Sequence, residues 1–163
     1  MNDVKTKAGY AAIIGLPNSG KSTLMNALLG QKISITTSKP QTTRKSIIGI
    51  LSEGDYQVIF QDTPGILEPD YLLQEKMMEQ VSSSINNADV IIYLIDIQND
   101  PDGSKLMTND FVKKTLNNRI PKIAVLNKAD LSDETKIKRT ISGLETSGNF
   151  IKKFMVSSIN HWI

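Results

Sequence analysis

The sequence predicts an α/β fold, with about six strands in a mostly parallel sheet and helices on both of its faces. Short apolar runs rich in β-branched residues recur along the chain, and stretches with the apolar spacing of helices lie between most of them. Strands that alternate with helices favour parallel pairing. Sheets of this kind bind ligands at the carboxyl ends of their strands, so the residues at those ends are the first candidates for function.

The strands are expected where apolar runs are bounded by turn-forming or polar residues. In chain order these runs are YAAIIG (10–15), SIIGIL (46–51), QVIFQD (57–62), VIIYLID (90–96), IAVLN (123–127) and FMVS (154–157). Only SEGD (52–55) and Tyr56 separate the second run from the third, which indicates a hairpin-type connection.

The helices are expected in the intervals between these strands. Residues 21–29 form the start of one helix, and two more are predicted at 105–118 and 133–146. A fourth follows from helical spacing of the residues Leu73, Met77, Val81, Ser84, Ile85 and Ala88. No closing helix is visible after the last strand, so we expect the final helix of the fold to be missing and the sequence to be a fragment.

Length and composition describe an ordinary globular domain. The chain has 163 residues, with 39% hydrophobic and 22% charged residues, which fits one domain over residues 1–163 with a single core. There is no cysteine, which excludes disulfides and thiolate metal sites. The longest apolar run, residues 90–95, is too short for a transmembrane segment, and the first ten residues lack the apolar core of a signal peptide.

Charge is distributed unevenly along the chain although its net value is only +2. Residues 1–52 hold seven Lys and Arg against one acid, whereas residues 53–110 hold twelve acids against two lysines. One interpretation is a basic first third that meets phosphates and an acidic middle that repels polyanions. The alternative is a set of ordinary solvated faces.

The segment GLPNSGKS, residues 15–22, matches the phosphate-binding pattern G-x-x-x-x-G-K-[ST] and lies between a predicted strand and a predicted helix. Glycines let the backbone curl around a phosphate, and the helix points its N-terminus at the same anion. Lys21 would reach the β- and γ-phosphates, and the Ser22 hydroxyl would ligate Mg²⁺. The nucleotide contacts expected from this loop are Gly15, Pro17, Asn18, Ser19, Gly20, Lys21, Ser22 and Thr23.

Three further segments follow predicted strands in a consistent order. In DTPG, Asp62 is positioned to hold Mg²⁺ through water, and the Gly65 amide to contact the γ-phosphate. In NKAD, the carboxylate of Asp130 can accept hydrogen bonds from both guanine donors, a pair that adenine does not offer. Lys128 would lie along the base, and Asn127 would brace neighbouring loops. The amides of SSI, residues Ser157, Ser158 and Ile159, would meet the guanine oxygen.

With these motifs the chain resembles the GTPase domain of the Era family, in the TrmE–Era class of Ras-like P-loop GTPases. The specific part is NALLGQKISITTSKPQTTR, together with DTPG and NKAD, and the resemblance covers nearly the whole chain. It implies a Ras-like GTPase fold, with GTP and GDP as substrate and product and Mg²⁺ as cofactor. Members of the family carry a C-terminal KH domain that binds RNA, and that domain is absent from this sequence.

The resemblance also implies roles for two loops. In the family a switch threonine ligates Mg²⁺ when GTP is bound, and here Thr43 is the choice, with Thr42 as the open alternative. Residues 31–45 would be the first switch and residues 62 to 75 or so the second. The resulting assignments are Lys21, Thr43 and Gly65 as catalytic, and Ser22, Thr43 and Asp62 as metal-binding.

Two residues, Ile66 and Asn18, concern the rate of hydrolysis. Ile66 follows DTPG where Ras-like proteins use a water-orienting glutamine, and isoleucine can neither donate nor accept a hydrogen bond. We therefore expect slow intrinsic hydrolysis. Class members with asparagine at the position of Asn18 bind K⁺ near the phosphates, so the resemblance implies stimulation by K⁺. The alternative role for Asn18 is to stabilise the loop.

The function expected from the resemblance is a GTP-hydrolysing switch in the assembly of the small ribosomal subunit and the maturation of 16S rRNA. It implies a cytoplasmic protein, with peripheral membrane association as an open alternative. Other readings of the same residues are another member of the TrmE–Era class, a guanine-nucleotide-binding module with negligible hydrolysis, and a P-loop kinase or ATPase. Asp130 argues against the last of these.

Overall fold

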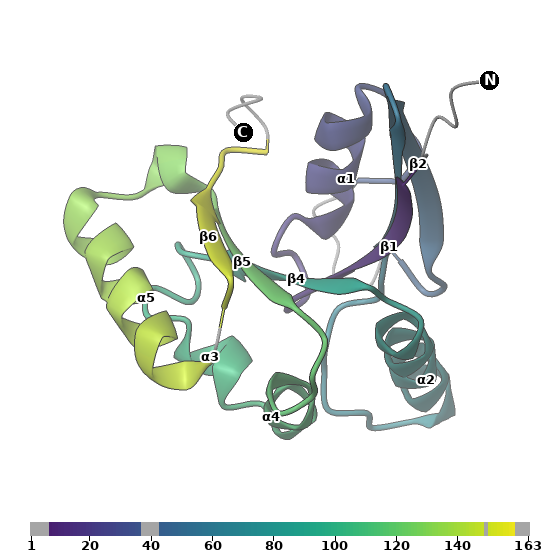
Figure 1. The fold of residues 1–163 in the computed structure, drawn as a ribbon. Helices are drawn as coiled ribbons and strands as arrows, with labels where there is room; N and C mark the ends of the chain where they lie inside the picture. Colours follow the sequence, from purple (N-terminus) through teal and green to yellow (C-terminus); the bar gives the residue numbers. More distant parts are fainter. Residues whose placement is uncertain (1–6, 37–42, 149, 159–163) are drawn as a thin grey trace.

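A computed structural model of the chain describes residues 7–36, 43–148 and 150–158, and these residues form one sheet with helices on both faces (Figure 1). The six-stranded sheet has the order β2-β3-β1-β4-β5-β6. All neighbouring strands are parallel except β2 and β3, which form an antiparallel hairpin. The predicted α/β class and hairpin are therefore both confirmed.

The strands lie close to the ranges expected from the sequence. They are β1 (Lys7–Ile14), β2 (Ile47–Glu53), β3 (Tyr56–Asp62), β4 (Val90–Asp96), β5 (Lys122–Asn127) and β6 (Lys152–Met155). The last strand begins and ends two residues before the predicted range of 154–157. All four residues of this strand are exposed. The buried residues Val156 and Ser157 come directly after it, in the loop.

The helices match three predictions and correct a fourth. They are α1 (Lys21–Leu29), α2 (Leu72–Asn86), α3 (Ser104–Met107), α4 (Asp110–Leu116) and α5 (Glu134–Ser147), with a 3-10 turn η1 (Ala129–Leu131). The single helix predicted at 105–118 is wrong, because the chain divides there into α3 and α4. Asn109 causes the division: its side chain accepts hydrogen bonds from the amides of Phe111 and Val112 and starts a new helix.

Two apolar cores fill the two faces of the sheet. One packs α2, α4 and α5 against β4 and β5, and Tyr93 is fully buried in it, with its ring edge-to-face with Phe150 at 5.4 Å. The other packs Leu24 and Met25 of α1 against β1 and β3. α1 thus lies on one face, and the remaining helices lie on the other. In the part of the chain that the structure describes, no helix follows β6.

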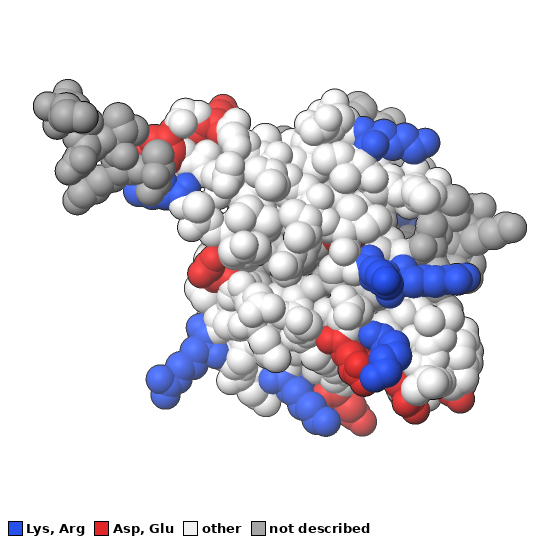
Figure 2. Space-filling view, turned by 90° about the vertical axis from the view of Figure 1, so that its right-hand side faces the viewer, with Lys and Arg blue, Asp and Glu red and all other residues white. Residues whose placement is uncertain are grey.

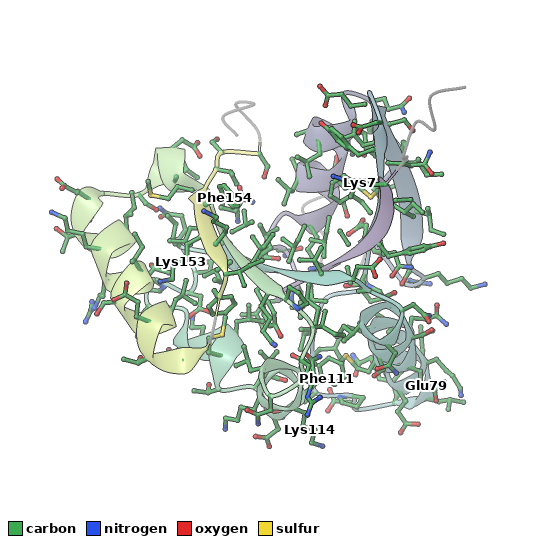
Figure 3. All side chains as sticks on the ribbon, viewed as in Figure 1. Lys7, Glu79, Phe111, Lys114, Lys153 and Phe154 are labelled. Atoms are coloured by element: carbon green, nitrogen blue, oxygen red, sulfur yellow. The ribbon has the colours of Figure 1, made fainter. Side chains whose placement is uncertain are left out.

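The charge segregation in the sequence does not give a single-sign surface on the face seen in Figure 2. Lysines, arginines and acids share that face, mostly toward its edges, around an uncharged centre. On β6, Lys153 lies beside α5, with its Nζ 3.4 Å from a carboxylate oxygen of Glu145 (Figure 3). None of the described helices has the length and apolar character needed to cross a bilayer.

Candidate nucleotide-binding site

The loop between β1 and α1 curls at the carboxyl end of the central strand. Asn18 and Gly20 both adopt left-handed backbone conformations, with φ of 61° and 96°. A Cβ atom on Gly20 would lie 2.3 Å from the Asn127 Nδ2 atom, so only glycine fits there. α1 begins at once, and the amides of its first turn have no partners within the helix. The loop therefore presents backbone donors suited to an anion.

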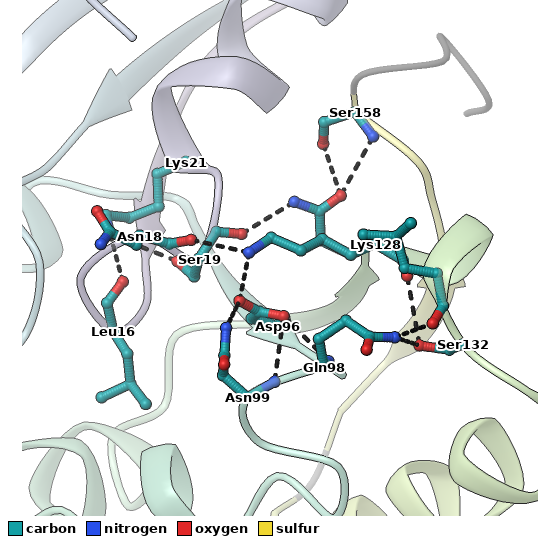
Figure 4. A network of polar contacts seen from close by, with 12 residues as sticks. Leu16, Asn18, Ser19, Lys21, Asp96, Gln98, Asn99, Lys128, Ser132 and Ser158 are labelled. Atoms are coloured by element: carbon teal, nitrogen blue, oxygen red, sulfur yellow. Dashed lines mark hydrogen bonds and ion pairs between the residues drawn. The ribbon is translucent and has the colours of Figure 1, made fainter. Parts of the chain in front are cut away.

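The side chain of Lys21 folds back over this loop and is only 7% exposed. Its Nζ donates to the carbonyl oxygen of Gly15 at 3.1 Å. It also donates to the carbonyl oxygen of Leu16 at 2.8 Å (Figure 4). Burial lowers the pKa of Lys21 to about 8, and the carboxylate of Asp62 partly opposes this shift. The ammonium is thus held at the loop in an environment that disfavours its charge unless an anion joins it.

A group of oxygen atoms lies beside the first turn of α1. The Ser22 hydroxyl donates to Asp62 Oδ2 at 2.6 Å, and its Oγ lies 3.3 Å from Thr43 Oγ1. Asp62 is fully buried, and burial raises the pKa of its carboxyl despite the opposing effect of neighbouring hydroxyls and of Lys21. Asp62 Oδ1 makes no hydrogen bond with any described residue. The structure thus brings all three predicted metal ligands together.

These oxygens fit a hard divalent cation. Mg²⁺ prefers oxygen ligands and usually keeps several waters, with one or two carboxylates and the phosphates of a nucleotide completing its shell. The described residues contain no group of three or more His, Cys, Asp and Glu that could hold a metal alone. A buried carboxylate oxygen without a hydrogen bond, next to two hydroxyls, suits a cation that takes its other ligands from water and substrate.

The segment after β3 packs directly on the phosphate-binding loop. The Thr63 hydroxyl donates to the carbonyl of Ile13 at 2.7 Å, and the Ile66 amide donates to the carbonyl of Gly15 at 3.0 Å. A Cβ atom on Gly65 would lie 2.8 Å from Pro17 Cα, so the two backbones approach as closely as glycine permits. The Ile66 side chain is 1% exposed and belongs to the core, away from any water in the site.

Asn127 joins three loops from the end of β5. Its Nδ2 donates to the carbonyl of Ser19 at 2.9 Å (Figure 4). Its Oδ1 accepts from the Ser158 amide at 3.2 Å and from the Ser158 hydroxyl at 2.8 Å. The residue is 2% exposed. These are the loop-bracing contacts that the sequence led us to expect from Asn127.

Asp96 is a site residue that the sequence analysis missed. It ends β4, and its Oδ2 lies 2.5 Å from Lys128 Nζ, which also donates to the carbonyl of Asn18 at 3.3 Å (Figure 4). The side chain of Asn99 and the amide of Gln98 hold the same carboxylate from the other side. The rule that ligands meet strand carboxyl ends could have indicated Asp96, because its strand lies between β1 and β5, two of the strands whose ends carry the motifs.

One cavity of about 470 Å³ connects these segments. Among the predicted residues, its lining includes Pro17, Asn18, Gly20, Lys21, Ser22, Thr23, Thr43, Gly65, Asn127, Lys128, Asp130, Ser157 and Ser158. Gly15, Ser19 and Asp62 are buried behind this lining. Asp130 is exposed on the turn η1 at one end of the cavity. Ile159 and Thr42 lie outside the described residues.

The cavity is also lined by residues to which the sequence analysis gave no individual role, namely Ile35, Thr36, Thr63, Asn99 and Leu131. A volume of this size, with lysine and helix amides at one end and a carboxylate at the other, can hold a small anionic ligand that carries hydrogen-bond donors. The arrangement matches what a purine nucleotide offers.

The chain is similar to known GTPases over most of its length. Residues 10–128 match a family model described as a 50S ribosome-binding GTPase. GTPase Era of Thermoanaerobacter sp. (strain X514) is 39% identical over 155 residues, and GTPase Era of Yersinia enterocolitica is 40% identical over 156. These alignments cover 95% and 94% of this chain but 50% of each relative. The chain thus spans about half the length of the curated relatives it matches.

Solved structures show the same likeness. A crystal structure of Era in complex with MgGDPNP and nucleotides 1506–1542 of 16S ribosomal RNA has a TM-score of 0.84 and 34% identity, over 95% of this chain and 52% of that one. A crystal structure of an Aquifex aeolicus Era variant bound to GDP and AlF4⁻ has a TM-score of 0.83, with the same identity and coverage. Elongation factor SelB from Methanococcus maripaludis shares the fold alone, with 18% identity and a TM-score of 0.71. That match covers 97% of this chain and 31% of SelB.

Proposed function

The chain belongs to the 50S ribosome-binding GTPase family, and from this premise we propose that it is the GTPase domain of an Era-like switch protein, which binds GTP and hydrolyses it to GDP and phosphate. One observation carries the proposal: the phosphate-binding loop, the cluster of oxygens around Asp62 and the NKAD segment all border a single cavity. Each group suits a different part of one molecule, namely the phosphates, a phosphate-bound cation and a base.

Selection of guanine is assigned to Asp130. The N1–H and the exocyclic amine of guanine are both donors, and a carboxylate accepts both, whereas adenine would leave that carboxylate unpaired. Asn127 and Lys128 stabilise the site, since their side chains donate to backbone carbonyls of the phosphate-binding loop. Ser157 and Ser158, in the loop after β6, border the same end of the cavity, and their amides are assigned to the guanine oxygen. The Ser158 amide donates to Asn127 Oδ1 in this structure, so it would share its hydrogen with guanine or turn to it.

The phosphates are assigned to the loop of residues 15–20 and to Lys21. Amides at the start of α1 would donate to the phosphate oxygens, and the buried ammonium of Lys21 would turn from the carbonyls of Gly15 and Leu16 to the anion. In this role Lys21 stabilises the negative charge that the transferring phosphoryl group carries in the transition state. The Gly65 amide is assigned to the γ-phosphate, since Gly65 packs against Pro17 and lines the same cavity.

Mg²⁺ is the cofactor that the site fits. Ser22 and Thr43 would ligate it with their hydroxyls, and Asp62 would hold it through water. When bound, the ion neutralises charge on the β- and γ-phosphates. The chain's own contribution is to keep these oxygens in a buried setting, where Asp62 keeps its orientation through the hydrogen bond from Ser22.

Hydrolysis by this chain is proposed to be slow and to depend on K⁺. Ile66 is packed into the core, so its side chain offers nothing to an attacking water. Asn18 lines the cavity, where its side chain could supply a ligand for K⁺ near the phosphates. Phosphate release measured in single turnovers, in matched KCl and NaCl, tests both points. Equal rates in the two salts would exclude stimulation by K⁺, and no release in either salt would favour a binding module.

In Era this domain is part of a longer protein. For such a longer protein we propose a cytoplasmic role in assembly of the small ribosomal subunit. The supporting observation is that a structural relative at 34% identity binds a 16S rRNA fragment, although the wider family's description names the 50S subunit. RNA contact is assigned to a C-terminal KH domain, and peripheral membrane association remains a separate proposal. Co-sedimentation of the longer protein with 30S and 50S subunits, in GTP and GDP, decides between the two subunits.

A further inference from the structure

The segment that follows α1 is attached to that helix by one side chain. Asn26 Oδ1 accepts from the amides of Ile33 and Ser34, each at 2.9 Å, and its Nδ2 donates to the carbonyl of Ser34 at 2.8 Å. The carbonyl of Asn26 also accepts from the Gln31 amide at 3.2 Å. Both polar atoms of the Asn26 side chain are therefore used to fix the backbone of two consecutive residues.

This attachment places Ser34 inside the protein. The residue is 1% exposed, and its hydroxyl oxygen makes no hydrogen bond with any described residue. Asp62 Oδ1, also buried, lacks a partner in the same way. Asn26 lies one turn beyond Ser22 on α1, and Ile35 and Thr36, which follow Ser34, line the same cavity as Ser22 and Thr43. The Ser34 hydroxyl is also one of the neighbours that lower the pKa of the Asp62 carboxyl, against the effect of burial. Two buried polar atoms without hydrogen bonds, one on Ser34 and one on Asp62, thus lie in the same part of the site.

Closing the end of α1 does not explain the arrangement. Gly30 ends the helix in the left-handed conformation, and its amide donates to the carbonyl of Ala27, as expected for a helix C-terminus. That cap needs no help from the Asn26 side chain. It also gives no reason for a serine hydroxyl to be buried without a partner, which destabilises a fold.

We propose that Ser34 is a positioning residue of the cation site, held there by Asn26. Its hydroxyl, directly or through one water, fixes the second oxygen of the Asp62 carboxylate, while Ser22 holds the first. The carboxylate is then held from both sides in the orientation that a hydrated Mg²⁺ requires. This inference rests on the proposed binding of Mg²⁺ and GTP.

The test measures the affinity for a fluorescent GTP analogue as a function of Mg²⁺ concentration. Loss of an outer-shell partner typically weakens a metal site by about 10-fold or more, so Ser34→Ala and Asn26→Ala should each raise the half-saturating Mg²⁺ concentration by about that factor. Their affinity for GDP in EDTA should stay within about twofold of the unmodified chain. Matched controls are Ser82→Ala in α2 and Asn87→Ala at the C-terminal cap of that helix, which should change neither value.

The stability of Ser34→Ala separates positioning from simple packing. Because the substitution removes a buried hydroxyl without a partner, the melting temperature of the cation-free chain should not fall, while its Mg²⁺ dependence shifts. The inference is overturned if the unmodified chain needs Mg²⁺ and Ser34→Ala needs no more, or if Ser34→Ala weakens GDP binding equally in EDTA. Failure of the unmodified chain to bind GTP at any Mg²⁺ concentration would instead contradict the proposed function.

Discussion

Replacing Asn127 with alanine would remove the side chain that ties the phosphate-binding loop to the loop after β6. Three hydrogen bonds would be lost: one to the carbonyl of Ser19, and two from the amide and hydroxyl of Ser158. Asn127 is 2% exposed, Ser19 is 1% exposed and Ser158 is 4% exposed, so water has little access to the groups left behind.

The expected loss of stability follows from these contacts. A hydrogen bond contributes about 1 kcal/mol net, and a buried group left without a partner costs roughly 1–3 kcal/mol. Three bonds among buried partners therefore predict a decrease of about 3 kcal/mol in the free energy of unfolding, a large part of the 5–15 kcal/mol typical of a domain. Ser158→Ala removes only one of the three bonds and should cost about 1 kcal/mol.

Urea denaturation followed by circular dichroism measures these values, with Asn87→Ala as the matched control. Asn87 is the C-terminal cap of α2, and its side chain donates to the exposed carbonyl of Ser83, so its loss should cost about 0.5 kcal/mol or less. The double variant of Asn127 and Ser158 should cost less than the sum of the single variants, since both remove the same bond. If Asn127→Ala costs no more than the control, the loop-joining role assigned to Asn127 is wrong.

Three further predictions concern the same site. Asp96→Asn removes the charge that holds Lys128, so the GDP dissociation constant from calorimetry should rise about tenfold, and an unchanged value would contradict this. The pKa of Lys21 is about 8 in the free chain, and phosphates favour its charged form; GDP binding should therefore take up a proton and weaken as pH rises above 8. Calorimetry in two buffers with different ionisation heats detects the proton uptake. A GDP affinity that stays unchanged up to about pH 9.5 would refute the prediction. Gly20→Ala places a methyl group 2.3 Å from the Asn127 amide nitrogen at a positive φ, so urea denaturation should show a loss of about 2 kcal/mol or more, and a neutral effect would contradict the fit.

Much of the fold and site could be predicted because the signals are local. The buried strands are continuous apolar runs, so β4 occupies the predicted range of 90–96, and the motifs follow at the strand ends. Parallel pairing then brings the ends of β1, β3 and β5 to one edge of the sheet, together with Lys21, Asp62 and Asn127.

The features that sequence reasoning missed depend on contacts between distant residues or on a single side chain. Asp96 and Lys128 are 32 positions apart, and nothing near Asp96 indicates its partner. Asn26 resembles any polar residue on a short helix until the segment after the helix folds back on it. The division between α3 and α4 follows from one capping side chain, Asn109, in a stretch whose apolar spacing is otherwise continuous.

The central claim is that one cavity binds a guanine nucleotide, with its phosphates on the loop of residues 15–20 and its base on Asp130. Calorimetric titration of the chain with GDP, a non-hydrolysable GTP analogue and ATP, each with Mg²⁺, tests it most directly. We predict that both guanine nucleotides bind at one site and that ATP binds weaker by a factor on the order of 10² or more. Equal affinity for ATP, or no binding of GDP, would contradict the account.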